Sequence, residues 1–295
     1  MAGFGALLTA MVTPFDERGA LDAKAAGDLA QWLVGQGNDG LVIAGTTGES
    51  PTITDDERLE LFRAVRAAVD VPLIAGATTN DTAHSVGLVE AAAEIGMDGI
   101  LAVTPYYNRP TQAGLDAHFR SIAAASSLPV LLYDVPGRTG RKIATETMLR
   151  LAREVPTIVG LKDASGDPAE TGRLIAEAPE GFVVYSGDEP LTLALLAYGA
   201  VGVIGVAAHW TAPEQAELLR AWAAGDLARV RDIHRRLLPS YAYMNSETCV
   251  FSQATKAALR VLGHDVGECR LPLGPAPEGT GERARAVLRD LGRDV

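Results

Sequence analysis

The stretch that sets the fold covers residues 99–133, in which an apolar run GILAV (99–103) is followed by QAGLDAHFRSIAAA (112–125) and a second apolar run, PVLLY (129–133). The two outer segments are almost continuously apolar, as strands buried on both faces are. The middle segment repeats apolar residues at three- and four-residue steps, which is typical of an amphipathic helix. A strand, a helix and a strand in this order predict a βαβ unit with parallel strands.

The same alternation extends in both directions and covers residues 7–206. Eight βα units, evenly spaced at about 25 to 30 residues, favour a closed barrel over its structural competitor, a doubly wound open sheet. We therefore predict an α/β protein with a (β/α)8 TIM barrel. The predicted strands are Leu7–Val12, Leu41–Ala44, Pro72–Ala75, Gly99–Val103, Pro129–Tyr133, Ile158–Leu161, Phe182–Tyr185 and Gly202–Val206. The predicted helices between them are Ala23–Gln36, Asp55–Val69, Thr82–Ile95, Gln112–Ala125, Ala144–Arg153, Pro168–Glu177 and Glu189–Tyr198.

Beyond the eighth predicted strand the pattern becomes wholly helical. A connector rich in proline and glycine, Pro272–Gly279, precedes the last helix. We predict a barrel domain over residues 1–224 and a C-terminal helical domain over residues 225–295. The helices expected in this part are Ala212–Ala223, Leu227–Tyr243, a segment around Thr255–Leu262, and Glu282–Leu291.

Composition and charge exclude several classes of function. The chain has 37 acidic and 26 basic residues, a formal charge of −11, which disfavours nucleic-acid binding. Cys249 and Cys269 lack metal or redox spacing, so free thiols are expected, and the scattered histidines suggest no metal site. The N-terminus lacks the charged start of a secretory signal, and no apolar run approaches the roughly 18 to 20 residues of a membrane helix. We expect a cytoplasmic protein.

Lysine is the most informative residue type, because the chain has only four. Lys24 and Lys142 occupy ordinary solvated positions, and Lys256 lies in an amphipathic segment where a surface position is expected. Lys162 directly follows the buried run 158–161, so its amine should enter the mouth of the barrel. Burial lowers the pKa of an ammonium group and yields an amine able to attack a carbonyl. A salt bridge of Lys162 with Asp163 or Glu49 is the structural alternative.

Tyr133 ends the neighbouring predicted strand and is suited to carry a proton to or from a carbinolamine on Lys162. Thr46 and Tyr107 are its candidate relay partners, and packing at the barrel mouth is the alternative role for Tyr133. The turn Gly45–Ser50 exposes amides and hydroxyls that suit a carboxylate or phosphate oxygen. The glycines of 199–205 miss the nucleotide-binding patterns, so we interpret them as tight packing around the eighth strand.

These residues resemble those of the dihydrodipicolinate synthase family, within the N-acetylneuraminate lyase-like, pyruvate-dependent class I aldolases. The resemblance implies a Schiff base between Lys162 and pyruvate, with no metal and no separate cofactor. The resulting enamine would attack aspartate semialdehyde on the route to lysine and diaminopimelate. The motifs that carry the resemblance are Ala10–Phe15, Gly45–Ser50, Val103–Pro110, Tyr133–Gly140, Gly160–Asp163, Ser186–Asp188 and Gly202–Val206.

The resemblance also implies roles for single residues. Tyr133 transfers protons, and Thr46 links it to Tyr107 from a neighbouring subunit of a homotetramer, a dimer of dimers. Thr47 contacts the pyruvate carboxylate, and Arg138 holds the carboxylate of the aldehyde. The remaining wall of the site is implied to consist of Gly187 and the carbonyl of Ile204.

The sequence departs from the family pattern in two places. Asp55, Arg58 and His84 stand where enteric-type members bind the feedback inhibitor lysine, so we predict weak or absent inhibition. The segment Thr248–Gln253 replaces a common Asn-Pro-x-Pro motif and resembles actinobacterial members. Two other functions stay open: a lyase acting on a 2-keto-3-deoxy sugar acid or a sialic acid, and a catalytically inactive binding protein.

Overall fold

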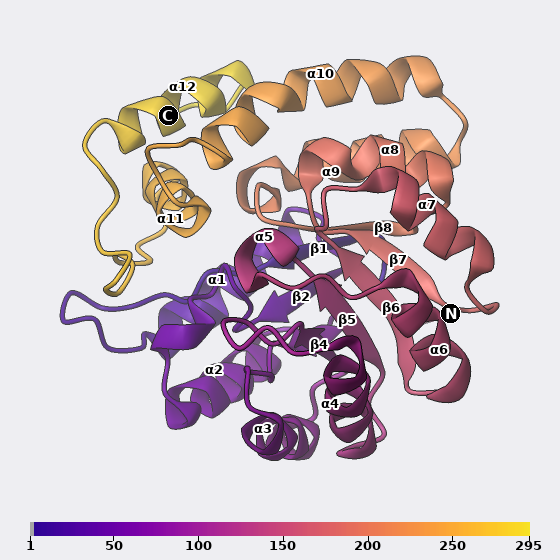
Figure 1. The fold of residues 1–295 in the computed structure, drawn as a ribbon. Helices are drawn as coiled ribbons and strands as arrows, with labels where there is room; N and C mark the ends of the chain where they lie inside the picture. Colours follow the sequence, from indigo (N-terminus) through magenta and orange to yellow (C-terminus); the bar gives the residue numbers. More distant parts are fainter. Residues whose placement is uncertain (1–2) are drawn as a thin grey trace. The chain divides into compact units, whose positions relative to one another are not determined.

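The computed structural model describes residues 3–295, and its eight strands form a closed barrel in chain order (Figure 1). The strand pairs whose register is given are all parallel. Every strand end lies within two residues of its predicted position, so the predicted (β/α)8 barrel is confirmed. The strands are β1 (Leu7–Ala10), β2 (Gly40–Ile43), β3 (Leu73–Ala75), β4 (Gly99–Val103), β5 (Val130–Asp134), β6 (Ile158–Asp163), β7 (Val183–Ser186) and β8 (Gly202–Gly205).

The chain divides into two compact units, and the first consists of the residues up to Ala6 together with Pro72–Ile204. Its strands bury apolar side chains, and its longer helices lie outside them (Figure 1). Side chains of Asp81, Thr111 and Asp167 cap the amino ends of three of these helices. The helices are α3 (Thr82–Ile95), α4 (Gln112–Ala124), α5 (Pro136–Thr139), α6 (Thr145–Glu154), α7 (Pro168–Glu177) and α8 (Thr192–Tyr198), with a 3-10 turn η2 at Glu189–Leu191.

Two glycines of this unit are required by close backbone packing. A Cβ atom at Gly160 would overlap the carbonyl oxygen of Val183, and one at Gly202 would overlap that of Ala6. The amide of Val203 donates to the same Ala6 carbonyl at 2.8 Å. Gly202 therefore serves the packing of β8, in agreement with the packing interpretation of residues 199–205.

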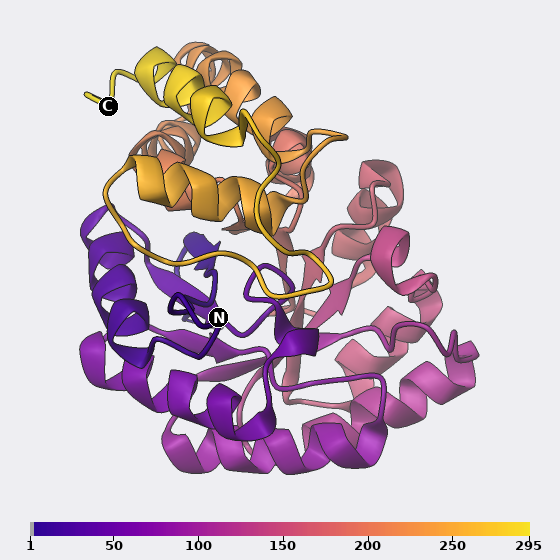
Figure 2. The same cartoon turned by 90° about the vertical axis from the view of Figure 1, so that its left-hand side faces the viewer.

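The second unit consists of Leu7–Val71 and Gly205–Val295. A capping box of Thr54 and Glu57 starts its second helix. The C-terminal helices α10, α11 and α12 pack against one another (Figure 2). The unit contains α1 (Ala23–Gly35), α2 (Asp55–Ala68), α9 (Ala208–Ala223), α10 (Leu227–Met244), α11 (Phe251–Val261) and α12 (Thr280–Asp290), with a 3-10 turn η1 at Ser50–Thr52. The predicted division at residues 224/225 stays a prediction.

Some sequence-based expectations are corrected here. Lys256 is fully buried, so the predicted surface position is wrong: its ammonium group lies 2.8 Å from the buried carboxylate of Glu49. Helix α9 begins at Ala208, four residues before the predicted start. The short helix α5 was not predicted. Cys249 and Cys269 are free thiols, as expected, and both are buried. No helix within residues 3–295 is long and apolar enough to span a membrane.

Candidate active site

The candidate site is built around Lys162 near the carboxyl end of β6. The side chain is 4% exposed and is therefore a buried cation. Tyr133 on β5 is its register partner, and the Nζ atom of Lys162 lies 4.5 Å from the centre of the Tyr133 ring. The structure thus brings together the two residues that the sequence singled out for amine chemistry, at the end of the barrel where active sites of this fold lie.

The electrostatic surroundings of Lys162 favour a reactive amine. Burial lowers the pKa of Lys162 from its usual 10.5 to about 8. The carboxylate of Glu189 opposes this shift, and the positive charge of Arg138 adds to it. Because the unprotonated amine is the nucleophile, a substantial fraction of it is available near neutral pH.

The two acidic residues considered as salt-bridge partners of Lys162 interact with other groups. The carboxylate of Asp163 accepts hydrogen bonds from the Thr171 hydroxyl at 2.9 Å and from the Ser165 amide at 3.2 Å. The carboxylate of Glu49 pairs with Lys256. Both acidic groups therefore have other partners, which favours the nucleophilic role for Lys162.

Gly187 follows β7 and lies directly against the Lys162 side chain. A Cβ atom at this position would be 2.9 Å from Cγ of Lys162 and 3.0 Å from its Cε. The Gly187 amide also donates to the carbonyl of Asp163 at 2.6 Å. A side chain at Gly187 would displace the lysine, so this glycine forms part of the wall around the reactive amine.

Arg138 lies on α5, a four-residue helix that begins at Pro136 and ends before Gly140 in the left-handed conformation. The segment is anchored by Asp134, whose carboxylate accepts from the Ile143 amide at 3.1 Å and faces the Lys142 ammonium at 3.4 Å. Burial raises the pKa of Asp134 to about 6, and Lys142 opposes this rise. The anchored loop presents the exposed Arg138 guanidinium beside the site.

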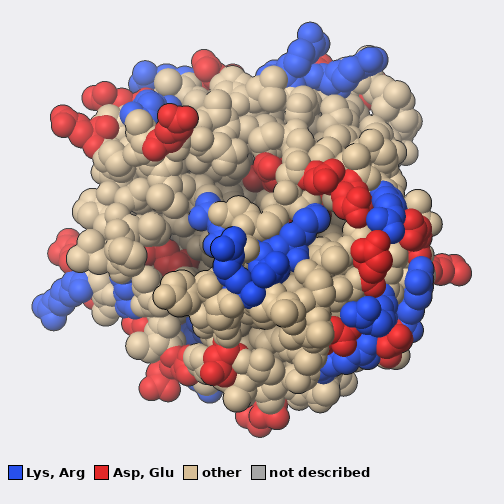
Figure 3. All heavy atoms as spheres, in the orientation of Figure 1, with Lys and Arg blue, Asp and Glu red and all other residues tan. Residues whose placement is uncertain are grey.

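Positive charge gathers over α5 although the whole chain is acidic. Figure 3 shows a group of Lys and Arg side chains over α5 on this face. Arg109 donates from Nε to the Gly140 carbonyl at 2.9 Å, and Arg141 donates to the Arg109 carbonyl at 3.1 Å. These bonds fix cationic side chains next to Arg138, where they attract anionic molecules such as carboxylates.

Tyr107, a predicted relay residue, is presented outward from the segment after β4. Its side chain is 90% exposed, and its backbone has a φ of +73°, which non-glycine residues rarely adopt. The structure therefore places Tyr107 on the surface of its own unit.

Thr46 and Thr47 belong to the second unit and follow β2 at its carboxyl end. Thr47 is buried and Thr46 half-buried. The turn that holds them is tight: the Thr13 hydroxyl donates to the Gly48 carbonyl at 2.6 Å, and the Ser50 amide donates to the Gly45 carbonyl at 3.3 Å.

Sequence reasoning missed two acidic residues of the first unit. Glu189 is 1% exposed and acts electrostatically on Lys162, and Asp134 anchors the loop of Arg138. Asp134 had the same signal that identified Lys162, namely a charged residue at the end of an apolar run. Ile204, the remaining predicted site residue, is fully buried in β8.

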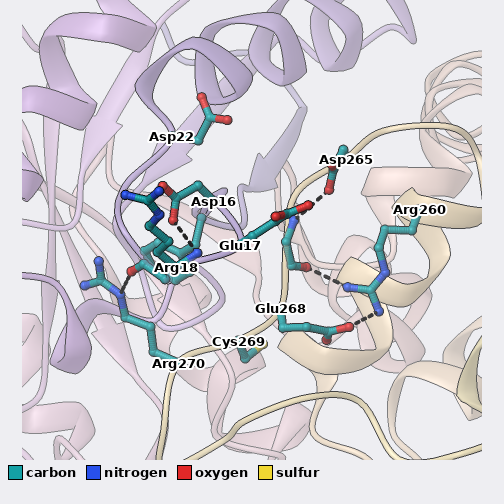
Figure 4. A pocket seen from close by; sticks show the side chains of 12 residues that line it. Asp16, Glu17, Arg18, Asp22, Arg260, Asp265, Glu268, Cys269 and Arg270 are labelled. Carbon is teal, nitrogen blue, oxygen red and sulfur yellow. Dashed lines mark hydrogen bonds and ion pairs between the residues drawn. The ribbon is translucent and has the colours of Figure 1, made fainter.

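A separate cavity of about 570 Å³ lies in the second unit (Figure 4). Its charged side chains are largely satisfied by neighbouring groups of the chain. Arg260 pairs with Glu268 at 2.9 Å, and Arg270 donates from Nε to the Gly19 carbonyl at 2.8 Å. We assign no substrate to this cavity.

The chain matches the model of the dihydrodipicolinate synthetase family over residues 3–291. It is 48% identical over 294 residues to the 4-hydroxy-tetrahydrodipicolinate synthase of Symbiobacterium thermophilum, with 99% of each chain covered. It also resembles a crystal structure of a DHDPS from Cyanidioschyzon merolae with lysine bound, with a TM-score of 0.95, 40% identity and 98% of each chain covered. Another similar structure is the chloride-inhibited dihydrodipicolinate synthase from Acinetobacter baumannii complexed with pyruvate, with a TM-score of 0.92, 35% identity and 98% and 99% of the two chains covered.

Proposed function

The chain belongs to the dihydrodipicolinate synthetase family, and from that membership we propose how it condenses pyruvate with aspartate semialdehyde to 4-hydroxy-tetrahydrodipicolinate, on the route to diaminopimelate and lysine. The observation that carries the proposal is the buried amine of Lys162 against the ring of Tyr133. The synthase name of the curated relatives favours this reaction over cleavage of a keto-deoxy sugar acid or a sialic acid.

The reaction begins when the neutral amine of Lys162 adds to the keto carbon of pyruvate. Loss of water from the carbinolamine gives an imine, and loss of a methyl proton gives the enamine. The enamine carbon then attacks the aldehyde carbon of aspartate semialdehyde, whose oxygen takes up a proton. Finally, the amino group of the bound semialdehyde adds to the imine carbon and displaces Lys162, which closes the ring. No metal or separate cofactor enters this sequence.

Proton transfers in these steps are assigned to the Tyr133 hydroxyl, with Thr46 and Tyr107 as its relay. The buried ring of Tyr133 against Lys162 supports this assignment. Thr47 and the amide of Thr46 are proposed to bind the pyruvate carboxylate. The Gly187 backbone and the carbonyl of Ile204 are proposed to complete the wall.

We propose a homotetramer, a dimer of dimers, in which Tyr107 reaches the site of a neighbouring subunit. The exposed side chain of Tyr107 and its unusual backbone conformation support a contact with a second copy of the chain. The mass of the purified protein by light scattering tests the assembly. Weak or absent inhibition by lysine also stays a prediction.

A coupled assay tests the proposed function. Purified protein, pyruvate and aspartate semialdehyde are mixed, and the cyclic product is consumed by dihydrodipicolinate reductase with NADPH. Turnover above about 1 per second, the ordinary range of enzymes, is expected. Absence of turnover while pyruvate is still trapped by borohydride would mean that the aldehyde partner is wrong.

The pH dependence of pyruvate capture should report the lowered pKa of Lys162. The neutral amine is half-populated near pH 8 rather than near 10.5. The initial rate of adduct formation, at pyruvate well below saturation, should therefore rise almost tenfold from about pH 6 to 7 and level off above about pH 8. Mass spectrometry of samples quenched with borohydride measures this rate. A midpoint near 10.5 would contradict the assignment.

Arg138→Ala should impair the use of aspartate semialdehyde but leave pyruvate capture intact. A guanidinium holds a carboxylate with two parallel hydrogen bonds, so kcat/KM for the aldehyde should fall by about 100-fold or more. Arg138→Lys should recover only part of this loss, because an ammonium group lacks the planar fork. An equal loss in the yield of the pyruvate adduct, measured at pH 9 where most Lys162 of the wild-type protein is unprotonated, would refute the assignment.

A further inference from the structure

A fully buried ion pair in the second unit joins the turn of Thr46 and Thr47 to the C-terminal helices. Nζ of Lys256, on α11, lies 2.8 Å from Oε1 of Glu49, and the two side chains are 0% and 1% exposed. Glu49 lies in the Gly45–Ser50 turn, directly after Gly48. The proposed mechanism gives neither residue of this pair a chemical role.

Both charges are enclosed by further contacts within the unit. The Lys256 ammonium donates to the Glu268 carbonyl at 3.0 Å and lies 4.2 Å from the centre of the Phe15 ring. The second oxygen of Glu49 accepts from the amide of Arg270 at 2.8 Å. Glu49 is therefore bound by a helix and by the segment that follows it.

Stability alone is a weak explanation for this arrangement. Removing two charges from water costs free energy that their attraction only partly returns, so apolar residues of similar volume often stabilise a fold as well or better. The pair does give a direction to the Glu49 side chain that an apolar contact would not give. This direction bears on the position of the turn that carries Glu49.

The backbone of the turn needs such a restraint. Ala44, just before the Gly45–Ser50 turn, and Glu49, near its end, have φ values of +56° and +58°, in the left-handed region. This conformation is costly for a non-glycine residue and persists where the surroundings hold it. On the other side of the turn, a Cβ at Gly48 would lie 3.0 Å from the Met11 carbonyl oxygen, so that side offers little space.

We propose that Glu49 and Lys256 are positioning residues, through which the C-terminal helices hold the Gly45–Ser50 turn in the conformation that binds the pyruvate carboxylate. The proposal rests on the function proposed above for Thr46 and Thr47. It gives the helical appendage a part in substrate binding.

The decisive variant is the double substitution Glu49→Gln with Lys256→Met, which removes both charges and keeps similar side-chain volumes. Lys256→Met alone leaves a buried unpaired carboxylate and is expected to unfold readily. The double variant avoids that defect and should fold. Glu49→Gln alone keeps an acceptor for the Arg270 amide, and Lys256 keeps the Glu268 carbonyl, so this variant serves as a milder second one.

Two measurements test the proposal. The pyruvate concentration that gives half-maximal adduct, measured by borohydride trapping, should rise roughly tenfold or more in the double variant. Small displacements of binding groups are costly. Hydrogen exchange of peptides covering residues 44–52 should accelerate to a similar degree without any substrate. Glu214→Gln is the matched control: it removes the C-terminal ion pair with Arg293, at 2.7 Å, and should change neither quantity.

Unchanged exchange over residues 44–52 and unchanged half-saturating pyruvate in a folded double variant would overturn the proposal. If the double variant fails to fold, the same two measurements on Glu49→Gln decide, with a smaller expected change in the same direction. Failure of the wild-type protein to capture pyruvate would instead refute the proposed function. The exchange measurement would still decide whether the pair holds the turn.

Discussion

Lys162→Ala is expected to abolish the covalent pyruvate adduct and to reduce kcat by at least about 10⁴-fold, because it removes the attacking amine. The loss should not come from unfolding. Lys162 is a buried cation, and replacing such a charge with a small apolar residue removes a desolvation cost. The cavity left by the shorter side chain opposes that gain, so the thermal midpoint, measured beside kcat, should change little.

The low lysine content makes this experiment easy to interpret. After reduction with borohydride, peptide mapping needs to distinguish only four lysines. Lys24→Ala is the control, because Lys24 is exposed and pairs with Asp28 one turn along its helix. An adduct of undiminished yield in Lys162→Ala, on Lys142 or Lys256, would show that the nucleophile has been assigned to the wrong residue.

The barrel was predictable because short, largely apolar runs alternate with longer segments of helical period, and strands buried on both faces have this pattern. The short helix α5 was missed because four residues carry no helical period. Sequence signals for the start and the end of this helix were nevertheless present: Pro136 stands at its first position and Gly140 follows its last. This matters for function, since α5 carries Arg138.

The prediction of the site rested on single charged residues that stand next to apolar runs. Lys162 was identified because it is one of few lysines and directly follows a buried apolar run. Lys256 was misplaced because helical spacing shows which residues share a face but not which face a distant segment covers. Its partner Glu49 lies far earlier in the chain and meets it only through tertiary packing.

Net charge was a poor guide to local electrostatics. The formal charge of −11 describes the whole chain, whereas Lys and Arg gather over α5 (Figure 3). Hydrogen bonds from the Arg109 and Arg141 side chains to backbone carbonyls hold this arrangement. An acidic protein can thus offer a cationic surface to the two carboxylate substrates proposed for it.

Tyr133→Phe is expected to lower kcat by about 10²- to 10⁴-fold, the usual contribution of a positioned proton donor or acceptor. The substitution removes only the hydroxyl oxygen. The ring that faces the Lys162 ammonium at 4.5 Å is retained, so the environment of the amine should be nearly unchanged. Pyruvate should still be trapped on Lys162 at equilibrium, but the adduct should form more slowly.

Tyr185→Phe is the matched control for this prediction. Tyr185 is the register partner of Lys162 on the opposite neighbouring strand, is 1% exposed, and donates its hydroxyl to the Gly5 carbonyl at 2.8 Å. Removing this hydroxyl should cost about 1 kcal/mol of stability, as loss of a buried hydrogen bond does, and leave kcat within about twofold. Equal losses of kcat in the two variants would mean that Tyr133 acts through packing. A loss confined to Tyr133→Phe, with the equilibrium adduct retained, would separate proton transfer from binding, because only the steps that move a proton need the hydroxyl.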